Sequence, residues 1–467
     1  MASGPTPIPE ITFIGSDHAL AARVGRPVRR FFDVEASGGI VLLVATAVAL
    51  IWANSPWSDT YHDLWRAPFE LRLGALHLGG GEHPLNLELL VNDGLMVIFF
   101  FVVGLEIKRE LISGHLRNRR AAALPAIAAL GGMVVPAAIF LAFNAGTPAV
   151  DGWGIPMATD IAFAVGVVSL LGNRVSRPMK VFLLTLAIVD DIGAILVIAI
   201  FYTESLNLGW LATAAVLVAI TFVLRELRVW YVPLYVLIGT LLWLALFQSG
   251  VHATLSGVML GLITPARPLQ SRKDAIRWVQ WLRDKGDELF AVDVAYASFH
   301  LRESVSVAER LQTALHPVSA YVIIPIFALA NAGVELGGGV LGDAAASRVT
   351  WGVALGLVAG KAVGIYAFTT IGRRLPFTEA PKGMGQLELL GLSVVAGIGF
   401  TVSLFVTGLA FDDQVLIDEA KIGILFASLV AGIAGLAILR FAAARRTGPV
   451  APSPMPVDET PTPVAAL

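Results

Sequence analysis

Apolar stretches of similar length recur along the whole chain, and short polar segments separate them. A helix that crosses a bilayer needs roughly 20 consecutive apolar residues. The pattern therefore predicts twelve membrane-spanning helices. They lie at residues 35–54, 87–109, 121–144, 153–172, 180–202, 208–224, 229–247, 250–264, 316–336, 351–372, 387–410 and 420–442. The eighth is short, and only the tripeptide Gln248-Ser249-Gly250 separates it from the seventh.

The composition agrees with this pattern. Of the 467 residues, 56% are hydrophobic and 15% are charged, whereas a soluble protein carries about 25% charged residues. The chain contains no cysteine, which excludes disulfides and thiol chemistry. We therefore predict an all-α membrane protein.

The basic residues are distributed unevenly between the two sides of the predicted membrane. Of the 33 Lys and Arg residues, all but five lie in loops on the side of the N-terminus. The exceptions are Arg66, Arg72, Arg348 and Lys421 in the opposite loops and Lys361 inside the tenth span. Because basic residues collect on the cytoplasmic side, both termini are predicted to be cytoplasmic. An odd number of spans would have broken this alternation.

Five regions follow from this topology. Residues 1–30 form a cytoplasmic N-terminal segment, and 31–446 form the twelve-span domain. Within that domain, the external loop 55–86 contains LRLGALHLGGGEH, whose alternating apolar residues predict a short hairpin. Residues 267–315 form a cytoplasmic insert. The proline-rich tail 447–467 is predicted to be disordered.

Two adjacent acids lie in the middle of the fifth span. Residues 183–202 read LLTLAIVDDIGAILVIAIFY, with Asp190 and Asp191 at the centre. An aspartate at a helix centre costs about 2.5–3.5 kcal/mol on insertion scales. Neighbours on a helix point about 100° apart, so the two side chains meet different surroundings. Ionisable groups inside a membrane usually serve function, and the alternative is a structural pair satisfied by hydroxyls and a buried lysine.

The fourth and eleventh spans contain helix-breaking residues. In GWGIPMATDIAFAVGVVSLL, Pro156 interrupts the helix just before Thr159 and Asp160. In LSVVAGIGFTVSLFVTGLAF, the helix is made similarly breakable by Gly397, Gly399, Thr401 and Ser403. The interruptions fall in the middle of two triplets, spans 3–5 and spans 10–12, which run in opposite directions. This layout predicts an inverted-topology repeat whose two broken helices cross at mid-membrane, as in ion-coupled transporters.

Charges in two other spans are candidates for function. Lys361 lies in GLVAGKAVGIYAF, near the middle of the tenth span, where snorkelling to the interface is the competing explanation. We expect Lys361 and Asp160 to balance the partial charges of the half-helix ends. The second span ends in FFFVVGLEIKRELISGHLRNRR, where Glu106, Arg109 and Glu110 form either a functional group or an ordinary interfacial cluster.

Taken together, these segments resemble one known family. PMATDIAFAVGV, LAIVDDIGAI, FFFVVGLEIKREL, SGVHATLSGV, FALANAG and GIGFTVSLF occur in the order of the NhaA-type bacterial sodium/proton antiporters, from about residue 30 to 442. The chain departs from the family pattern at Gln312 and Thr313, where an acid and a histidine are expected, and in its longer insert. These departures concern the pH threshold rather than the transport chemistry.

The resemblance implies roles for particular residues. It implies that sodium binds at Asp190 and Asp191, with Thr159 and Asp160 in the same site. It also implies that Lys361 pairs with Asp190 and takes part in charge balance and proton coupling. The residues assigned to pH regulation are Glu106, Arg109, Glu110, His252 and His316; for His252, a packed structural histidine is the alternative.

The function expected is secondary active transport. Intracellular sodium, and lithium as well, would be exchanged for external protons by alternating access, in an electrogenic and pH-regulated cycle. We expect no cofactor, no nucleic-acid partner, a bacterial inner membrane and a homodimer formed through the external loop 55–86. A membrane prenyltransferase is disfavoured, because Ile192, Gly193, Ala194 and Ile195 supply no further acid after the pair. A cation channel or a sodium-coupled symporter is the other alternative, which a flux assay without organic solute distinguishes.

Overall fold

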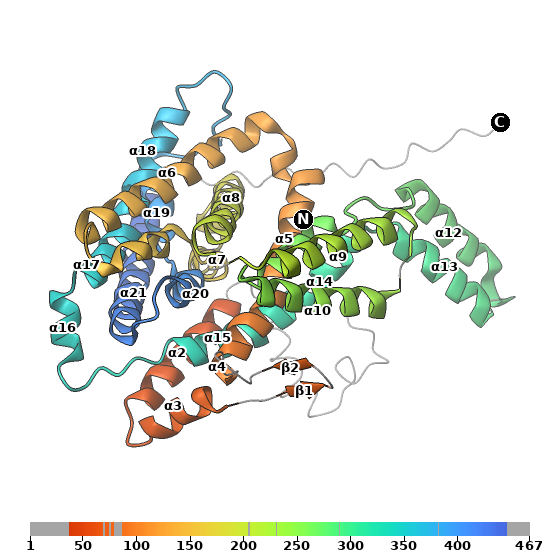
Figure 1. Ribbon diagram of the computed structural model, residues 1–467. Coiled ribbons are helices and arrows are strands. Elements are labelled where there is room, and N and C mark those ends of the chain that lie inside the picture. Colours follow the sequence, from red (N-terminus) through yellow and green to blue (C-terminus); the bar gives the residue numbers. More distant parts are fainter. Residues whose placement is uncertain are drawn as a thin grey trace, which may run out of the picture.

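The computed structural model describes residues 37–445 except 69–70, 74–75, 79–85, 204–205, 230, 289 and 382. The segments 1–30 and 447–467, for which a cytoplasmic location and disorder were predicted, lie outside the described residues. The described part is built almost wholly from helices, and one two-stranded sheet lies at its edge (Figure 1).

The first half of the chain begins with helices that alternate with short connections. Its elements are α2 (Ser37–Ala53), α3 (Ser58–Arg66), β1 (Leu71–Leu73), β2 (Leu76–Leu78), α4 (Leu87–Leu89), a π-helical segment (Leu90–Leu95), α5 (Met96–Ile112), α6 (Arg119–Asn144), a 3-10 segment (Pro148–Met157), α7 (Ile161–Ser169), α8 (Arg177–Phe201) and α9 (Leu208–Glu226). Further short 3-10 turns occur at His115–Arg117 and Gly172–Arg174.

The second half continues in the same manner. Its elements are α10 (Val232–Ser249), α11 (Leu255–Ile263), α12 (Arg272–Lys285), a 3-10 turn (Gly286–Glu288), α13 (Ala291–Glu303), α14 (Val307–Val318), a π-helical segment (Ser319–Ile323), α15 (Ile324–Asn331), α16 (Val340–Ala346), α17 (Arg348–Leu355), a π-helical segment (Gly356–Gly360), α18 (Lys361–Gly372), α19 (Gln386–Val395), α20 (Phe400–Ala410) and α21 (Gln414–Ala444).

The structure supports a multi-pass membrane protein. Among the described residues, eight helices are long and apolar enough to cross a membrane, or eleven if each of three bent pairs is one span. The predicted eighth span corresponds to α11, which has only nine residues and does not reach this length. The number twelve therefore stays a prediction.

The helix that contains the predicted ninth span starts earlier than its apolar stretch. One candidate span runs from Val307 to Asn331, through α14, a π-helical segment and α15. Ser306 begins it, because its hydroxyl accepts a hydrogen bond from the backbone N–H of Glu309. The hydropathy pattern does not predict this start, because charged residues occupy the first turns of α14.

The insert predicted at residues 267–315 contains a helical hairpin of α12 and α13, which projects at the edge of the molecule (Figure 1). The rings of Trp278 and Tyr296 meet edge to face, with centroids 5.3 Å apart. Lys285 Nζ lies 2.8 Å from Asp293 Oδ2, and this hydrogen bond lowers the pKa of the Asp293 carboxyl. The insert thus has contacts of its own between its two helices.

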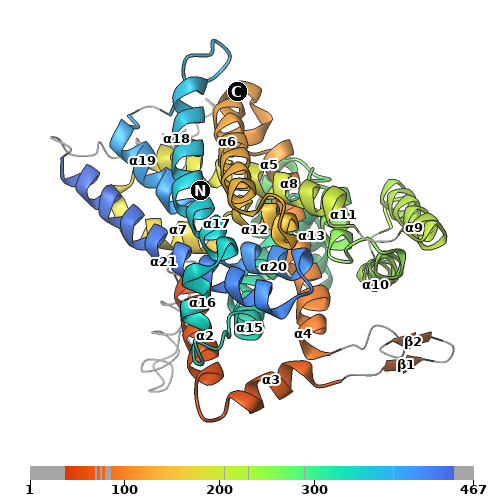
Figure 2. The ribbon, with the colours of Figure 1, turned by 60° about the vertical axis from the view of Figure 1, so that its left-hand side comes forward.

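The predicted hairpin in the external loop is confirmed. Strands β1 and β2 pair antiparallel, with Leu71 opposite Leu78 and Leu73 opposite Leu76. Figure 2 shows this hairpin and α3 at one end of the molecule, opposite the connection between α18 and α19.

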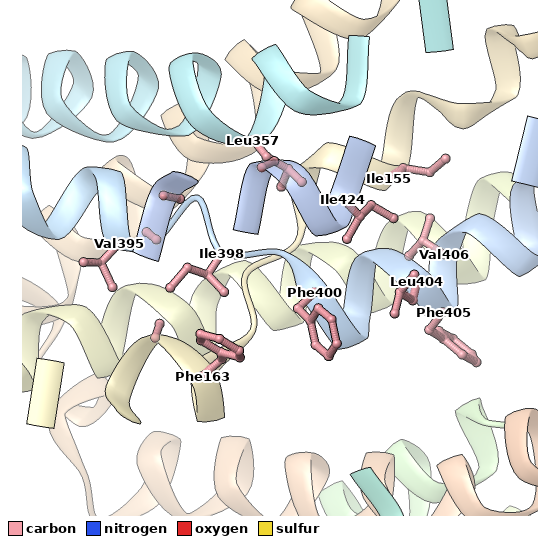
Figure 3. Packing of buried hydrophobic residues seen from close by; sticks show 14 of the residues in the cluster. Ile155, Phe163, Leu357, Val395, Ile398, Phe400, Leu404, Phe405, Val406 and Ile424 are labelled. Carbon is pink, nitrogen blue, oxygen red and sulfur yellow. The ribbon is translucent and has the colours of Figure 1, made fainter. Parts of the chain in front are cut away.

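The core surrounds two bent helix pairs. The 3-10 segment Pro148–Met157 and α7 are bent by 42°, and α19 and α20 by 46°. Phe163 of α7 and Phe400 of α20 lie with ring centroids 5.9 Å apart, and Leu357 and Ile398 pack nearby (Figure 3). The largest hydrophobic cluster therefore holds the two breaks together.

Candidate functional site

The two broken helices meet through their unwound segments. The Asp160 backbone N–H donates to the Ile398 carbonyl oxygen at 2.7 Å. The Thr159 hydroxyl donates to the Ala396 carbonyl oxygen at 2.8 Å. Backbone groups that a continuous helix would have satisfied internally are paired here across the two breaks. The interruptions predicted from Pro156 and Gly397 thus face each other in the interior.

Glycine allows this close approach. A Cβ at Gly397 would overlap the carbonyl oxygen of Leu357, and a Cβ at Gly399 would overlap the Ser403 hydroxyl. Any larger residue would therefore push the unwound segment away from its neighbours.

Asp160 lies between the beginnings of two half-helices. Its Oδ1 accepts the backbone N–H of Phe163 at 2.9 Å and so caps α7. Its Oδ2 accepts the hydroxyl of Thr401 at 2.6 Å and the Thr401 backbone N–H at 3.1 Å, in the first turn of α20. Because the beginnings of helices carry partial positive charge, one carboxylate balances both. Both oxygens of Asp160 have partners, so we assign it a balancing role.

Lys361, from the predicted tenth span, reaches the crossing of the two broken helices. Its Nζ donates to Asp190 Oδ2 at 2.6 Å and to the Thr159 hydroxyl at 2.9 Å. Lys361 is 0% exposed and Asp190 1% exposed, so the pair is fully removed from solvent. Through Thr159, the lysine also connects to Ala396, whose carbonyl lies at the end of α19. Lys361 thus does not snorkel.

The two adjacent aspartates of α8 have different surroundings, as their helical spacing predicts. Asp190 Oδ2 is occupied by Lys361, while Asp190 Oδ1 has no hydrogen-bond partner among the described residues. Asp191 is 8% exposed, and its carboxylate forms no hydrogen bond with another described residue. Carboxylate oxygens without protein donors are the ligands that hard cations and protons take.

No resident metal site accompanies them. Among the described residues, no group of three or more His, Cys, Asp or Glu side chains is arranged to hold a metal ion.

The residues assigned to pH regulation divide into two places. Glu106, Arg109 and Glu110 follow one another along α5, and the charge of Arg109 acts on His316 of α14. Glu110 Oε2 accepts the backbone N–H of His115 at 2.8 Å, and its Oε1 lies 3.6 Å from Arg109 Nη2. The charge of Glu106 acts on Asp191. Of these four residues, only Glu106 acts directly on an aspartate, while Arg109 and Glu110 act on Glu106 and Arg109 acts on His316.

His252 lies elsewhere. Its Nε2 is 2.6 Å from the carbonyl oxygen of Tyr202, just after the end of α8 and about three helical turns beyond Asp191. Tyr202 in turn donates its hydroxyl to the Asp151 carbonyl oxygen at 2.7 Å and accepts the Gly154 N–H at 3.1 Å. His252 thus joins a network between α8 and the 3-10 segment Pro148–Met157. It lies apart from Glu106, Arg109, Glu110 and His316, which we call the α5 cluster.

Thr401 is the residue of the site that sequence reasoning missed. It was noted only as part of a breakable helix, yet it makes two of the hydrogen bonds to Asp160. A signal was present, because Thr401 follows the glycine break in span eleven as Thr159 follows the proline break in span four.

A multi-pass helical membrane protein with charges buried where broken helices meet belongs to the class of secondary transporters rather than enzymes. The particular family is shown by comparison with known proteins: the chain belongs to the Na+/H+ antiporter 1 family, whose family model matches residues 29–439. The resemblance drawn from the motifs is thereby confirmed.

Several curated relatives cover nearly the whole chain. It is 49% identical over 429 residues to the Na(+)/H(+) antiporter NhaA of Anaeromyxobacter sp., which covers 90% of this chain and 92% of the relative. It is 47% identical over 437 residues to Na(+)/H(+) antiporter NhaA 3 of Frankia alni, covering 93% of each. It is 46% identical over 424 residues to the NhaA of Rhodopirellula baltica, covering 89% and 93%.

Proposed function

We propose that this protein exchanges intracellular sodium for external protons across a bacterial inner membrane, and that lithium can replace sodium. The relatives are named Na+/H+ antiporters, which supports the choice of ions. The observation that carries the proposal is the arrangement on α8. There Asp190 is paired with Lys361, and the carboxylate of Asp191 forms no hydrogen bond with another described residue.

The cycle rests on competition for the same carboxylates. Protonated Asp190 and Asp191 release their protons to the cytoplasm, and one sodium ion binds in their place. Ionised Asp191 and the free oxygen of Asp190 contribute ligands, with Thr159 beside them. The site is then exposed to the outside, sodium leaves and protons return. A group that binds either ion but not both well couples the two movements.

Lys361 and Asp160 stabilise the ion site both when it is empty and when it holds a cation. Lys361 neutralises Asp190 when this carboxyl group is ionised and no sodium is bound. Asp160 stays hydrogen-bonded to both half-helices, so it can hold the crossing together while the site changes its exposure. Movement of the unwound segments against their neighbours is the step that alternates access.

The proposed architecture has twelve spans with inverted repeats in spans 3–5 and 10–12. The excess of basic residues on one side supports cytoplasmic termini, including residues 1–30 and the tail 447–467. The breaks in spans four and eleven support the repeat. We further propose that two copies associate through the external loop 55–86.

The α5 cluster is proposed to regulate exchange by pH. Glu106 acts on Asp191, and Arg109 and Glu110 act on Glu106, so a change of protonation in this group would alter the energy of an ion at Asp191 through Glu106. His316 is connected to the group through Arg109. His252 would act at a distance, through Tyr202 and the broken fourth span.

The test measures sodium-induced proton efflux from proteoliposomes over a series of pH values, with no organic solute present. Asp191→Asn removes a ligand charge at constant volume and is expected to abolish exchange without loss of folding. Asp151→Asn, an exposed acid outside the site, is the matched control and should exchange normally. Near-normal exchange by correctly inserted Asp191→Asn protein would contradict the proposal.

A further inference from the structure

A cavity of about 350 Å³ lies away from the aspartates and is not explained by the cycle above. Polar side chains from three parts of the chain line it, together with Leu89, Leu404, Gly408 and Ile417. The polar ones are Asn86, Glu88, Asn92, Asn331, Gln414 and Lys421. These residues come from the start of the second span, the end of α15 and the start of α21, which the predicted topology places on the external side.

Two amides tie opposite walls of this cavity together. Asn331 Nδ2 donates to Asn92 Oδ1 at 2.7 Å, and Asn92 Nδ2 donates to Asn331 Oδ1 at 3.2 Å. Asn92 lies in the π-helical segment Leu90–Leu95, a kind of local distortion that is frequent at functional sites. The second span and α15 are thereby held at a fixed distance.

The cavity points toward the crossing of the broken helices. Leu404, which lines it, lies about one helical turn beyond Thr401, the residue that binds Asp160. Leu404 is only 1% exposed, and Phe405 beside it packs against Phe100 with ring centroids 5.2 Å apart (Figure 3). The half-helix α20 thus contacts Asp160 through Thr401 and contributes Leu404 to the cavity lining.

Lys421 is the unusual member of the lining. It is one of only four basic residues on the side predicted to be external, and it is 7% exposed, so it is no ordinary solvated surface charge. Its ammonium group forms no hydrogen bond or ion pair with another described residue. The charges that act on it are those of Glu88, Asp418 and Arg66, and only Glu88 shares the cavity lining.

We propose that this cavity is the outer mouth of the ion path and that Lys421 sets the affinity for external sodium. The inference rests on the function proposed above. A fixed positive charge in a partly desolvated passage raises the energy of a cation there, and the nearby carboxylate of Glu88 lowers it. Sodium that enters from outside, and sodium that leaves to the outside, therefore pass the same raised barrier, while sodium that binds from the cytoplasm does not meet it.

The experiment measures the half-saturating sodium concentration separately at each face. Right-side-out vesicles present the external face to added sodium, and everted vesicles present the cytoplasmic face. Lys421→Gln is expected to lower the external value by roughly three- to tenfold and to leave the cytoplasmic value in place. Glu88→Gln is expected to raise the external value. Lys421→Arg keeps the charge and should shift the external value far less than Lys421→Gln.

Salt distinguishes the buried Lys421 from a solvated surface charge. A partly buried charge is screened much less than an exposed one, so adding choline chloride should leave most of the difference between Lys421→Gln and the wild type in place. Arg348→Gln removes an exposed basic residue from the same side but outside the cavity, and it serves as the control.

Three results would overturn the inference. They are equal shifts at both faces, a Lys421→Arg shift as large as that of Lys421→Gln, and an external value that rises in Lys421→Gln. If Lys421→Gln does not insert into the membrane, the Glu88→Gln variant provides the test. An unchanged half-saturating sodium concentration at the external face of this variant would also overturn the inference. A wild type without sodium-induced proton movement at either face would overturn the proposed function as well, so the two failures are distinguishable.

Discussion

Lys361 donates a hydrogen bond of 2.6 Å from its Nζ to Asp190 Oδ2, and both side chains are buried. The two residues come from the tenth and fifth spans, so the pair joins distant parts of the chain. A second hydrogen bond, to the Thr159 hydroxyl, ties the lysine to the broken fourth span. One ammonium group therefore connects three spans at the place where the aspartates lie.

Lys361→Ala should destabilise the protein, because it leaves the Asp190 carboxylate buried without its cation. Removing one partner of a buried ion pair typically costs about 3–5 kcal/mol. Thermal unfolding of the purified protein in detergent measures the loss, and the same variant should exchange weakly or not at all in proteoliposomes.

The double variant Lys361→Ala/Asp190→Asn is the control for that explanation. It removes both charges, so it should recover part of the stability that the single variant loses. A double variant that unfolds no later than Lys361→Ala would mean that the lysine stabilises by packing rather than by charge.

Thr401→Val tests the contact that joins the two broken helices. The substitution removes the hydroxyl that donates to Asp160 at 2.6 Å and keeps the side-chain volume. A hydrogen bond to a charged group contributes about 1.5–3 kcal/mol, so a loss of that size in the free energy of unfolding is expected. Thermal or denaturant unfolding in detergent provides the measurement.

Thr407→Val is the matched control in the same helix. The Thr407 hydroxyl is buried and donates only to the carbonyl of Ser403, one turn earlier. That neutral bond contributes about 1 kcal/mol. If the two variants were equally stable, the bond between Thr401 and Asp160 would have no special role at the crossing.

Glu110→Gln should shift the pH dependence of exchange toward lower pH. The charge of Glu110 acts on Glu106, and that of Glu106 acts on Asp191. Removing a negative charge from this group weakens proton binding by its neighbours, so activation should begin roughly half a pH unit lower. The amide retains the acceptor for the His115 N–H, which limits structural damage.

Proton efflux at a series of pH values measures this shift. Asp284→Asn, which removes an exposed charge in the insert, is the control and should leave the profile in place. An unchanged profile for Glu110→Gln would return the α5 cluster to an ordinary interfacial role.

The broken helices could be predicted from the sequence because their causes are local. Pro156 removes a helical hydrogen bond, and Gly397 lacks the side chain that would keep the backbone apart from Leu357. Which groups meet across the breaks could not be predicted, because it depends on the relative placement of spans distant in the chain. The hydrogen bonds from Thr401 to Asp160 are of this kind.

The cavity around Lys421 could not be predicted from the sequence either. In the sequence, Lys421 lies near a predicted span boundary and is one of four basic residues on the side predicted to be external. Only the folded arrangement shows that it is buried and that it lines a cavity with Asn92 and Asn331. The π-helical segment that carries Asn92 also has no periodicity signal that would distinguish it from a regular helix.

The last prediction concerns the charge moved in each cycle. If Asp190 and Asp191 both take protons and one sodium ion replaces them, more protons than sodium ions cross per turnover. Lys361, which is paired with Asp190, would be a second source of a proton if sodium binding breaks this pair. A membrane potential is worth about 2.3 kcal/mol per elementary charge per 100 mV, so it should drive sodium flux even without a pH gradient.

Proteoliposomes with equal pH on both sides and a potassium diffusion potential imposed by valinomycin test this directly. Sodium flux should follow the sign and the size of the potential at pH values where the protein is active. Asp191→Asn protein in the same liposomes provides the baseline for passive leak, since it lacks the charge that exchanges the ions. Flux of the wild type that ignores the potential would mean one proton for one sodium ion, because only a neutral cycle is insensitive to voltage.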